Sequence, residues 1–340
     1  MRILVGMSGG VDSAYAASLL LSEGHDVEGA VLKMHDYTEL SSAREAALSV
    51  GIPLHEIDCT QLFDLEVKDY FVREYKSGRT PNPCIICNER VKMRALYDYA
   101  LRHDFDKIAT GHYGRVVISP ENGAHALAVA EDPVKDQSYM LYRLPEQILS
   151  ALLLPLSRGK KEEVRGAAAL AGISVAHKKD SQEICFLPDG NHAEFVEERA
   201  GKCPGGDFID SEGNVLGRHK GIVHYTVGQR KGLGIALGKR MFVTAIDSVS
   251  NTVTLSPEIK GREVIVLCDT IFSGMDIPAE TVSVRLEAKL RYTASPVSVT
   301  ASISPNGEVT LIPDKPATAA PGQSAVLYKN GVVMLGGIIC

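Results

Sequence analysis

The sequence predicts an α/β fold, a doubly wound parallel sheet, followed by a small β-rich central domain and a C-terminal antiparallel β-barrel. Over the first part of the chain, short apolar runs alternate with helical patterns, which is typical of parallel strands joined by helices. After Pro257 apolar and polar residues alternate steadily, and Asn306-Gly307 and Asn330-Gly331 are hairpin signals. We therefore expect domains at residues 1–195, 196–258 and 259–340.

The composition favours a soluble, cytoplasmic protein without membrane contact. The chain has 340 residues and 7 cysteines, an odd number that does not suggest a secreted disulfide framework. No apolar run approaches the roughly 18 residues of a transmembrane helix. Met1-Arg2 leads straight into an apolar strand pattern, so we expect no signal peptide.

The net charge of -6 argues against indiscriminate binding of nucleic acid, but the charge is unevenly spread. Residues 151–260 carry 15 Lys+Arg and 13 Asp+Glu, and the rest of the chain carries 21 and 29. Within the middle part, residues 226–234 form a glycine-rich basic stretch that could contact a phosphate backbone. A locally basic middle is compatible with a polyanionic partner.

The first predicted element is a strand that runs into a glycine-rich loop and then a helix. Ile3-Leu4-Val5 is the strand, and the loop consists of Gly6, Met7, Ser8, Gly9, Gly10, Val11, Asp12 and Ser13. The small side chains leave the backbone N–H groups open to an anion, and the positive end of the helix dipole points into the same space. Asp12 would repel a phosphate unless a divalent cation lay between them, so the loop predicts Mg²⁺ as well. The spacing fits neither a Walker loop nor a dinucleotide fingerprint.

The next elements complete a parallel sheet. We expect strands at residues 27–32 and 53–57 and a helix at 40–50. Ligands of such sheets bind at the carboxyl ends of the strands. Leu32 ends the second strand at that level, where it could flank an adenine ring or belong to the sheet core.

A helix at residues 62–76 leads into a stretch, 77–88, in which two prolines and a glycine predict irregular structure. Cys84 and Cys87 lie there, and Cys87 precedes a helix predicted at 89–103, where the dipole would favour a thiolate. The pair is compatible with a redox pair, half of a metal site or a buried structural pair.

Two further polar groups follow predicted strands or turns. Gly111 and His112 end a short strand, where the glycine would admit a ribose or base close to the backbone, and His112 is either a ligand or a loop histidine. Lys135, Asp136 and Gln137 suit phosphates and base edges, although solvated loops have the same composition.

Cys185 lies between apolar neighbours and downstream of Lys178-Lys179, a setting that favours either a thiolate or a buried strand cysteine. In the predicted barrel, Arg291, Tyr292 and Gln323 are placed at strand ends, where a barrel contacts ligands.

Eight motifs in order resemble one family, the tRNA-specific 2-thiouridylases (MnmA family) of the PP-loop ATP pyrophosphatase superfamily. The motifs are SGGVDS at residues 8–13, PNPCIICN at 81–88, ATGHY at 109–113, KDQSY at 135–139, DSQEICF at 180–186, TVGQRKGLG at 226–234, LRY at 290–292 and PGQSAV at 321–326. The resemblance implies the Rossmann-like fold of the adenine nucleotide alpha hydrolases for the first domain and tRNA-contacting central and barrel domains behind it.

The resemblance implies a reaction in which ATP, with Mg²⁺, adenylates the C2 oxygen of wobble uridine 34 and a cysteine persulfide supplies sulfur to C2, giving 2-thiouridine, AMP and pyrophosphate. Cys185 matches the persulfide cysteine and Cys87 its nucleophilic partner, which can form a transient disulfide with Cys185. Positions 6–13 with Leu32 and Gly111 match the ATP site. The positions that match tRNA contacts are Asn82, Pro83, Cys84, His112, Lys135, Asp136, Gln137, Arg291, Tyr292 and Gln323. Implied partners are tRNAs for Lys, Glu and Gln and a sulfur donor such as a cysteine desulfurase or a sulfur-relay protein.

One departure opens a second mechanism. Many members have Asp where this chain has Cys84, and a thiol does not replace a carboxylate in acid/base work without a large pKa shift. Three thiolates, at Cys84, Cys87 and Cys185, could instead ligate a [4Fe–4S] cluster with one iron open for sulfide. The persulfide relay and the cluster both remain open at this point.

Two other function classes also remain. Another PP-loop adenylating enzyme, acting on a small carboxylate or a nucleotide, would exchange pyrophosphate without tRNA. A non-catalytic module that binds tRNA or senses metal would bind tRNA without releasing AMP. Ser8, Asp12 and Ser13 are all present, which argues against a decayed site.

Overall fold

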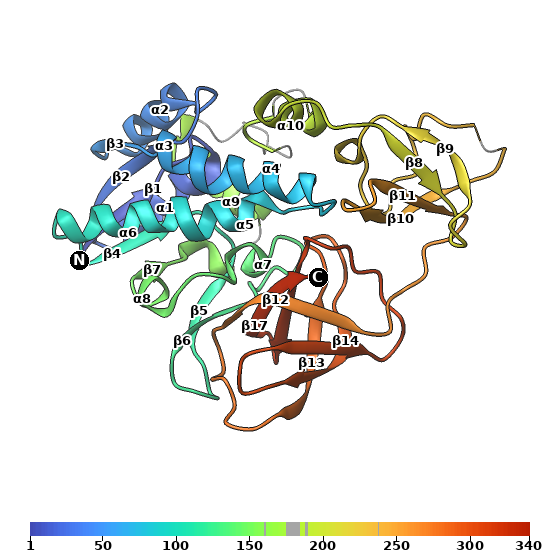
Figure 1. Cartoon of the computed structure of the whole chain (residues 1–340). Coiled ribbons are helices and arrows are strands. Elements are labelled where there is room, and N and C mark those ends of the chain that lie inside the picture. The colour runs from blue at the N-terminus through green and yellow to red at the C-terminus, as the bar shows by residue number, and fades with distance from the viewer. Residues whose placement is uncertain (160, 175–183, 188–189, 237) are drawn as a thin grey trace.

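The computed structural model describes residues 1–159, 161–174, 184–187, 190–236 and 238–340. The N-terminal part contains a five-stranded parallel sheet in the order β3-β2-β1-β4-β7 (Figure 1). Its strands are β1 (Arg2–Gly6), β2 (Asp26–Lys33), β3 (Leu54–Asp58), β4 (Lys107–Thr110) and β7 (Leu152–Leu153). The predicted doubly wound sheet is confirmed.

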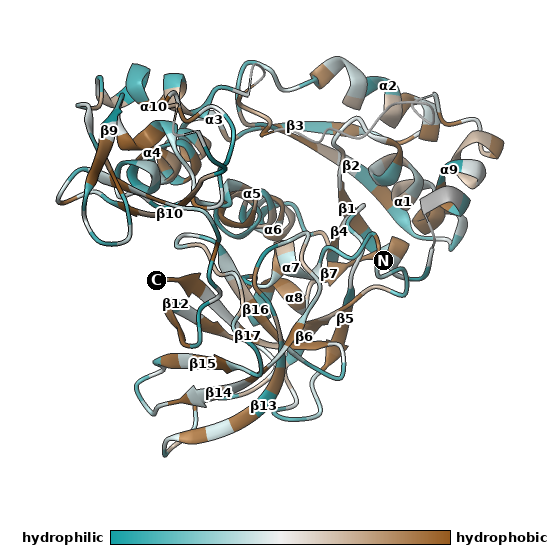
Figure 2. Cartoon of the chain, turned by 90° about the vertical axis from the view of Figure 1, so that its right-hand side faces the viewer, coloured by the Kyte–Doolittle hydropathy of each residue, from teal (hydrophilic) through white to brown (hydrophobic). Residues whose placement is uncertain are grey.

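Helices cover both faces of this sheet (Figure 2). On one face, α1 (Val11–Ser22) packs against α2 (Leu40–Val50) and α9 (Lys161–Leu170). On the other, α6 (Met93–Arg102) packs on β1 and β4. Both faces of β1 are fully buried, because Ile3 and Val5 face the α1 side and Leu4 the α6 side. This sheet holds the carboxyl ends of its strands, and the loops that follow them, at one edge.

The predicted helix at 62–76 forms as α3 (Thr60–Phe63), a π-helical turn at Asp64–Lys68 and α4 (Asp69–Lys76). The irregular stretch predicted through residue 88 is wrong in its second half, because α5 (Pro83–Cys87) is helical. Pro83 occupies the first turn, where the missing N–H of proline costs nothing and its fixed φ suits a helix. A second π-helical turn at Asn88–Lys92 joins α5 to α6.

The middle part is a four-stranded sheet in the order β10-β11-β8-β9, preceded by the helix α10 (His192–Ala200). Its strands are β8 (Gly206–Ile209), β9 (Val215–His219), β10 (Phe242–Asp247) and β11 (Thr252–Ser256). The small β-structure predicted from the turn clusters is confirmed.

The C-terminal part is a closed antiparallel barrel of six strands, because β12 pairs with both β15 and β17. The strands are β12 (Ile265–Phe272), β13 (Val282–Lys289), β14 (Val297–Ile303), β15 (Val309–Pro313), β16 (Ser324–Lys329) and β17 (Val332–Ile339). A hairpin of the N-terminal part consists of β5 (Arg115–Ile118) and β6 (His125–Ala128). It joins the start of β17, where Val332 pairs with Ala128. The short helices α7 (Ser138–Leu141) and α8 (Glu146–Leu149) follow this hairpin.

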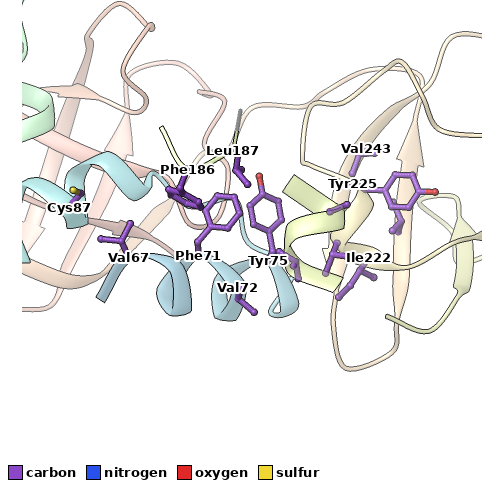
Figure 3. Close-up of a cluster of buried hydrophobic side chains, with 14 of the residues drawn as sticks. Val67, Phe71, Val72, Tyr75, Cys87, Phe186, Leu187, Ile222, Tyr225 and Val243 are labelled. Carbon is purple, nitrogen blue, oxygen red and sulfur yellow. The ribbon is translucent and has the colours of Figure 1, made fainter. Parts of the chain in front are cut away.

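One buried cluster joins the N-terminal and middle parts (Figure 3). Phe71 of α4 packs against both Tyr75 and Phe186, and the same cluster continues to Tyr225 and Val243 of the middle part. Burying aromatic side chains of this size stabilises a contact by roughly 1.5–3 kcal/mol each. The segment around Phe186 is therefore anchored between the two parts.

In the described residues, no helix has the length and apolarity needed to cross a membrane.

Candidate active site

The glycine-rich loop lies where β1 meets α1, as the sequence predicts. Ser13 Oγ accepts a hydrogen bond from Ser8 N–H at 3.2 Å and donates one to the carbonyl of Gly10 at 3.1 Å, so the two serines hold the loop closed. Gly9 has φ of +71°, and a Cβ there would lie 2.7 Å from Ser42 Cβ and 2.9 Å from Ala43 N. Only glycine fits this position. The loop leads into the first turn of α1, and the N-terminal end of a helix, with its unpaired N–H groups, suits a phosphate.

Asp12 and Tyr113 connect the loop to the end of β4. Tyr113 Oη donates to Asp12 Oδ1 at 2.9 Å, and Tyr113 N–H donates to Gln137 Oε1 at 2.9 Å. The carboxylate of Asp12 is partly buried beside the loop. A carboxylate next to a phosphate cradle suits Mg²⁺, which binds carboxylate and phosphate oxygens together.

Gly111 lies against α1. A Cβ at Gly111 would be 2.6 Å from the carbonyl carbon of Asp12 and 2.6 Å from Ser13 N. The position therefore needs glycine because the backbone of α1 fills the space, and it holds the first turn of that helix against β4. Leu32, at the end of β2, is partly buried and packs against two core clusters, so its role in the sheet core is directly visible.

Cys84 and Cys87 share one face of α5, three residues apart. Cys87 is 3% exposed and its Sγ contacts Met34 Sδ at 3.7 Å. Burial raises the pKa of the Cys87 thiol to about 12, against a smaller lowering by Lys92. The predicted helix-dipole thiolate is wrong, because Cys87 ends α5 inside a continuous helical segment and desolvation outweighs the dipole. The resting thiol is protonated at neutral pH.

Cys185 is exposed as a residue, and it is followed directly by the buried Phe186. Although the residue is exposed, neighbouring atoms partly exclude water from its sulfur, and this desolvation raises the pKa of the Cys185 thiol. The positive charge of Lys92 lowers the pKa by a smaller amount. Phe186 belongs to the same buried cluster as Cys87, so its packing holds the neighbouring Cys185 near α5. We call the continuous helical segment from Pro83 to Lys92, which carries Cys84 and Cys87, the cysteine helix. Lys178-Lys179, on which the thiolate prediction for Cys185 relied, lie outside the described residues.

Lys92 is the site residue that the sequence analysis missed. Burial lowers the pKa of Lys92, but the negative charges that the sulfurs of Cys87, Cys84 and Cys185 gain on deprotonation together raise it by more, so the pKa is raised overall. Lysine in a helix looks like a surface residue in a sequence. Lys92 lies five residues after Cys87. This spacing indicates that the two side chains share a face only if the helix contains a π-helical turn, which the sequence does not reveal.

Cys59 also belongs to this neighbourhood. It is buried, and burial raises its pKa to about 11. Two other buried groups near the cysteine helix, Asn88 Oδ1 and both ring nitrogens of His35, have no hydrogen-bond partner in the described parts of the chain. Unpaired buried polar atoms are costly, which is compatible with a bound polar ligand at this end of the sheet.

Three family models match consecutive parts of the chain. They are described as a tRNA methyl transferase HUP domain at residues 1–189, a tRNA methyl transferase PRC-barrel domain at 193–257 and an aminomethyltransferase beta-barrel domain at 271–339. Relatives named tRNA-specific 2-thiouridylase MnmA match along the full length. The protein of Acetivibrio thermocellus is 40% identical, with 99% of each chain covered, and that of Clostridium perfringens is 42% identical, with 99% of this chain and 98% of the relative covered.

The chain belongs to the tRNA-specific 2-thiouridylase family. The relative from Clostridium acetobutylicum, 41% identical over 99% of each chain, carries the same name. A solved structure from Methanocaldococcus jannaschii, described as a predicted subunit of tRNA methyltransferase, has 15% identity and a TM-score of 0.35 over 58% of this chain and 88% of its own. That likeness is too low to carry an argument.

The positions that we expect from the sequence to contact tRNA fall into two groups. Asn82, Pro83 and Cys84 begin α5, and Asn82 Nδ2 approaches Met140 Sδ at 3.7 Å. His112 is hydrogen-bonded to Thr110 Oγ1 at 2.9 Å, and burial, helped by the charge of Lys92, lowers its pKa to about 3, so it is neutral at pH 7.

The Lys135–Gln137 turn is built around a buried carboxylate. Asp136 is 5% exposed, and its oxygens accept from the N–H groups of Ala130 and Ser138 and from Ser138 Oγ. The visible role of Asp136 is to shape this turn, which leaves Lys135 and Gln137 as the partly exposed members.

The barrel supplies the second group. Gln323 Nε2 donates to the carbonyl of Thr80 at 2.8 Å, and Thr80 N–H donates to the carbonyl of Pro321 at 2.9 Å. A Cβ at Gly322 would lie 2.8 Å from Thr80 N. The barrel loop thus holds the segment that leads directly into Asn82 and α5.

Arg291 and Tyr292 follow β13 at the same end of the barrel. Arg291 is exposed, whereas Tyr292 is half-buried against Tyr139 with the ring centroids 5.9 Å apart. Lys289 Nζ lies 5.3 Å from the Tyr292 ring centroid. An aromatic ring with cations beside it suits stacking on a base and contact with phosphates.

The predicted [4Fe–4S] cluster is not supported. Although Cys84, Cys87 and Cys185 all act on Lys92, no group of three His, Cys, Asp or Glu side chains in the described residues is arranged to hold a metal ion.

The basic loop predicted at residues 226–234 lines an open groove of about 570 Å³ on the middle part. Arg230, Lys239 and Arg240 lie along it. Three cations around one groove are suited to a phosphate backbone.

Proposed function

We propose that this chain thiolates the C2 position of the wobble uridine in tRNA, with ATP consumed to AMP and pyrophosphate. Family membership makes it a tRNA thiouridine sulfurtransferase, a transferase that modifies tRNA to 2-thiouridine and uses ATP. The observation that carries the proposal is the common neighbourhood of Cys87, Cys185 and Lys92 beside a phosphate loop on one sheet edge.

The N-terminal part, residues 1–195, is the catalytic domain in this proposal. The loop from Gly6 to Ser13 binds the phosphates of ATP through backbone N–H groups at the start of α1. Asp12 would hold Mg²⁺, which would neutralise phosphate charge. Gly111 keeps the loop in place by its contact with α1, and Leu32 borders the adenine.

The first step makes C2 of the uracil ring electrophilic. The C2 oxygen attacks the α-phosphorus of ATP, and pyrophosphate leaves. A poor leaving group becomes AMP, so a sulfur nucleophile can displace it. Asn82 and Pro83, held in place by the barrel loop through Thr80, are the residues next to the target base.

The second step moves sulfur. The terminal sulfur of a persulfide on Cys185 attacks C2 and forms the C–S bond. The thiol of Cys87, protonated at rest, gives its proton to water, and its sulfur then attacks Sγ of Cys185; the S–S bond to the transferred sulfur breaks, and its electron pair stays on that sulfur. This pair forms the C=S bond while the C2–O bond breaks and AMP leaves. A thiol reductant resets the Cys87–Cys185 disulfide, and a sulfur-donor protein, such as a cysteine desulfurase or a sulfur-relay protein, reloads Cys185.

The other parts of the chain hold the tRNA. In this proposal residues 196–258 contact the tRNA backbone through the groove at Arg230, and residues 259–340 contact it through Arg291, Tyr292 and Gln323. The substrates are the tRNAs for Lys, Glu and Gln, and the reaction takes place in the cytoplasm.

Mass spectrometry of tRNA nucleosides tests the proposal. A strain that lacks this protein is expected to lack 2-thiouridine derivatives at the wobble position, and the intact gene restores them. Complementation with Cys185→Ser is expected to restore nothing, whereas Cys203→Ser, which changes a cysteine outside the site, restores the wild-type level. Unchanged 2-thiouridine in the deletion strain would refute the proposed function. Restoration by Cys185→Ser would refute the sulfur relay.

A further inference from the structure

The cysteine helix contains a cation at a place where helix geometry does not usually put one. Met93 N–H bonds to the carbonyl of Asn88, five residues back, in the π-helical turn that follows Cys87. In a regular α-helix the fifth residue after Cys87 would lie roughly 140° around the axis from it. The π-helical turn widens the helix and brings Lys92 back toward the face that carries Cys84 and Cys87.

The same face meets the segment that carries Cys185. Phe186 is 4% exposed and packs in one cluster with Cys87, Phe63 and Phe71. The Lys92 ammonium consequently lies within electrostatic range of all three sulfurs, of Cys84, Cys87 and Cys185.

Among the residues that the structure describes, no carboxylate competes for this charge. In the described part of the chain Lys92 forms no ion pair with Asp or Glu, and the groups that raise its pKa are the thiols alone. By contrast, the neighbouring Arg90 pairs with Glu66 at 3.0 Å, and Lys68 of the other π-helical turn pairs with Asp64 at 2.9 Å. Lys92 is partly buried, and an ammonium withdrawn from water costs free energy unless an anion occupies the site during the reaction.

We propose that Lys92 is the counter-charge of the sulfur-transfer step. This inference rests on the proposed function and names a residue that acts on the reacting sulfur atoms. The ammonium pairs with the anionic terminal sulfur of the Cys185 persulfide as it approaches C2. When Cys87 attacks Sγ of Cys185, the ammonium stabilises the Cys87 thiolate, which is otherwise unfavourable in this apolar environment. Lys92 neither gains nor loses a proton in these steps.

Charge variants separate this role from a structural one. Lys92→Met keeps the length of the side chain without its charge, and Lys92→Arg keeps the charge. With protein carrying persulfide, undermodified tRNA and saturating ATP, single-turnover sulfur transfer in Lys92→Met is expected to fall by about 100-fold or more, the size expected for a lost transition-state charge. Lys92→Arg is expected to recover at least a tenth of the wild-type rate. The exposed Lys76→Met serves as the control and transfers sulfur at the wild-type rate.

Release of pyrophosphate, measured in the same reactions, separates a failure of the proposed function from a failure of the counter-charge role alone. If wild type releases no pyrophosphate with tRNA, the proposed function fails. If wild type releases it and Lys92→Met both releases it and transfers sulfur within threefold of wild type, the counter-charge role fails. Lost sulfur transfer with pyrophosphate release kept within threefold supports that role.

A second measurement needs no variant and so does not depend on variant folding. A cation beside a sulfur speeds its reaction with the anionic reagent iodoacetate relative to the neutral reagent iodoacetamide. The rate ratio of the two reagents at Cys185, followed by peptide mass spectrometry, is expected to exceed that at Cys203 at least fivefold, because at Cys203 the negative charge of Glu197 acts more strongly than the positive charge of Lys76. Equal ratios at the two cysteines would overturn the assignment of Lys92.

Discussion

The contact between Gly111 and α1 predicts a specific loss in Gly111→Ala. The added Cβ would lie 2.6 Å from both the Asp12 carbonyl carbon and Ser13 N, about 1 Å closer than ordinary contact. Both neighbours are backbone atoms, so neither can rotate away. Overpacking of this kind costs about 1–3 kcal/mol, and relief requires α1 to move away from β4 together with the phosphate loop. We expect ATP affinity to fall about tenfold or more, because a small misplacement of a binding group is costly.

The assay for Gly111→Ala is ATP binding by calorimetry together with thermal unfolding. A loss of 1–3 kcal/mol corresponds to a fall of about 2–4 °C for each kcal/mol. Gly166→Ala is the matched control: Gly166 lies in α9 with no atom within 4 Å of its added Cβ, so this variant gains roughly 1 kcal/mol of helix propensity and keeps its ATP affinity. Wild-type stability and wild-type ATP affinity in Gly111→Ala would refute this account of the loop.

Two further predictions concern the barrel contact and the buried thiols. Gly322→Ala is expected to reduce tRNA thiolation at least fivefold at unchanged ATP affinity, because its Cβ would meet Thr80 N at 2.8 Å. Gly213 has a similar φ of +89° but lies in open space, so the control Gly213→Ala is expected to keep full activity. Equal activities of the two variants would contradict the barrel's positioning role. The raised pKa values of Cys59, about 11, and Cys87, about 12, predict that stability is fully present below the unfolded thiol pKa near 9 and is lost as the pH rises toward 12. Urea titrations are expected to show a slope of up to about 1.4 kcal/mol per pH unit for each thiol, halved in Cys59→Ala, whereas a flat profile between pH 9 and 11 would show that the thiols are not desolvated.

Local sequence patterns predicted the regular elements well. The helix α2 has the predicted bounds of residues 40 to 50, since Gly51, at φ of +80°, ends it as a left-handed cap. The hairpin turns with Gly307 and Gly331 have the positive φ angles that their sequences suggest, 80° and 77°, and they organise the predicted barrel. These features depend on residues close together in the chain.

The errors concern what only tertiary packing decides. The prolines before Cys84 led to an irregular loop in the prediction, whereas Pro83 begins a helix. The thiolate predicted at Cys87 is absent because residues distant in sequence, such as Phe63 and Phe186, exclude water around it. Sequence spacing alone also gave no reason to single out Lys92, whose position depends on a π-helical turn.

Some features could be predicted only in part from the sequence. The phosphate loop was identified from its small residues, but the reason for Gly111 is a contact between β4 and α1 that no local pattern contains. Likewise, the pairing of the β5–β6 hairpin with the barrel through Val332 joins segments about 200 residues apart. Gln323 was correctly placed at a strand end, while its hydrogen bond to Thr80 required the assembled structure.

The most direct test follows isotopically labelled sulfur from Cys185 to tRNA. Protein loaded with a ³⁴S persulfide at Cys185 is mixed once with ATP and undermodified tRNA, and nucleosides and AMP are measured by mass spectrometry. We expect one ³⁴S-labelled 2-thiouridine and one AMP for each labelled sulfur lost, with a Cys87–Cys185 disulfide left in the protein. Release of AMP without label in uridine, or label in uridine with Cys87 still reduced, would contradict the account.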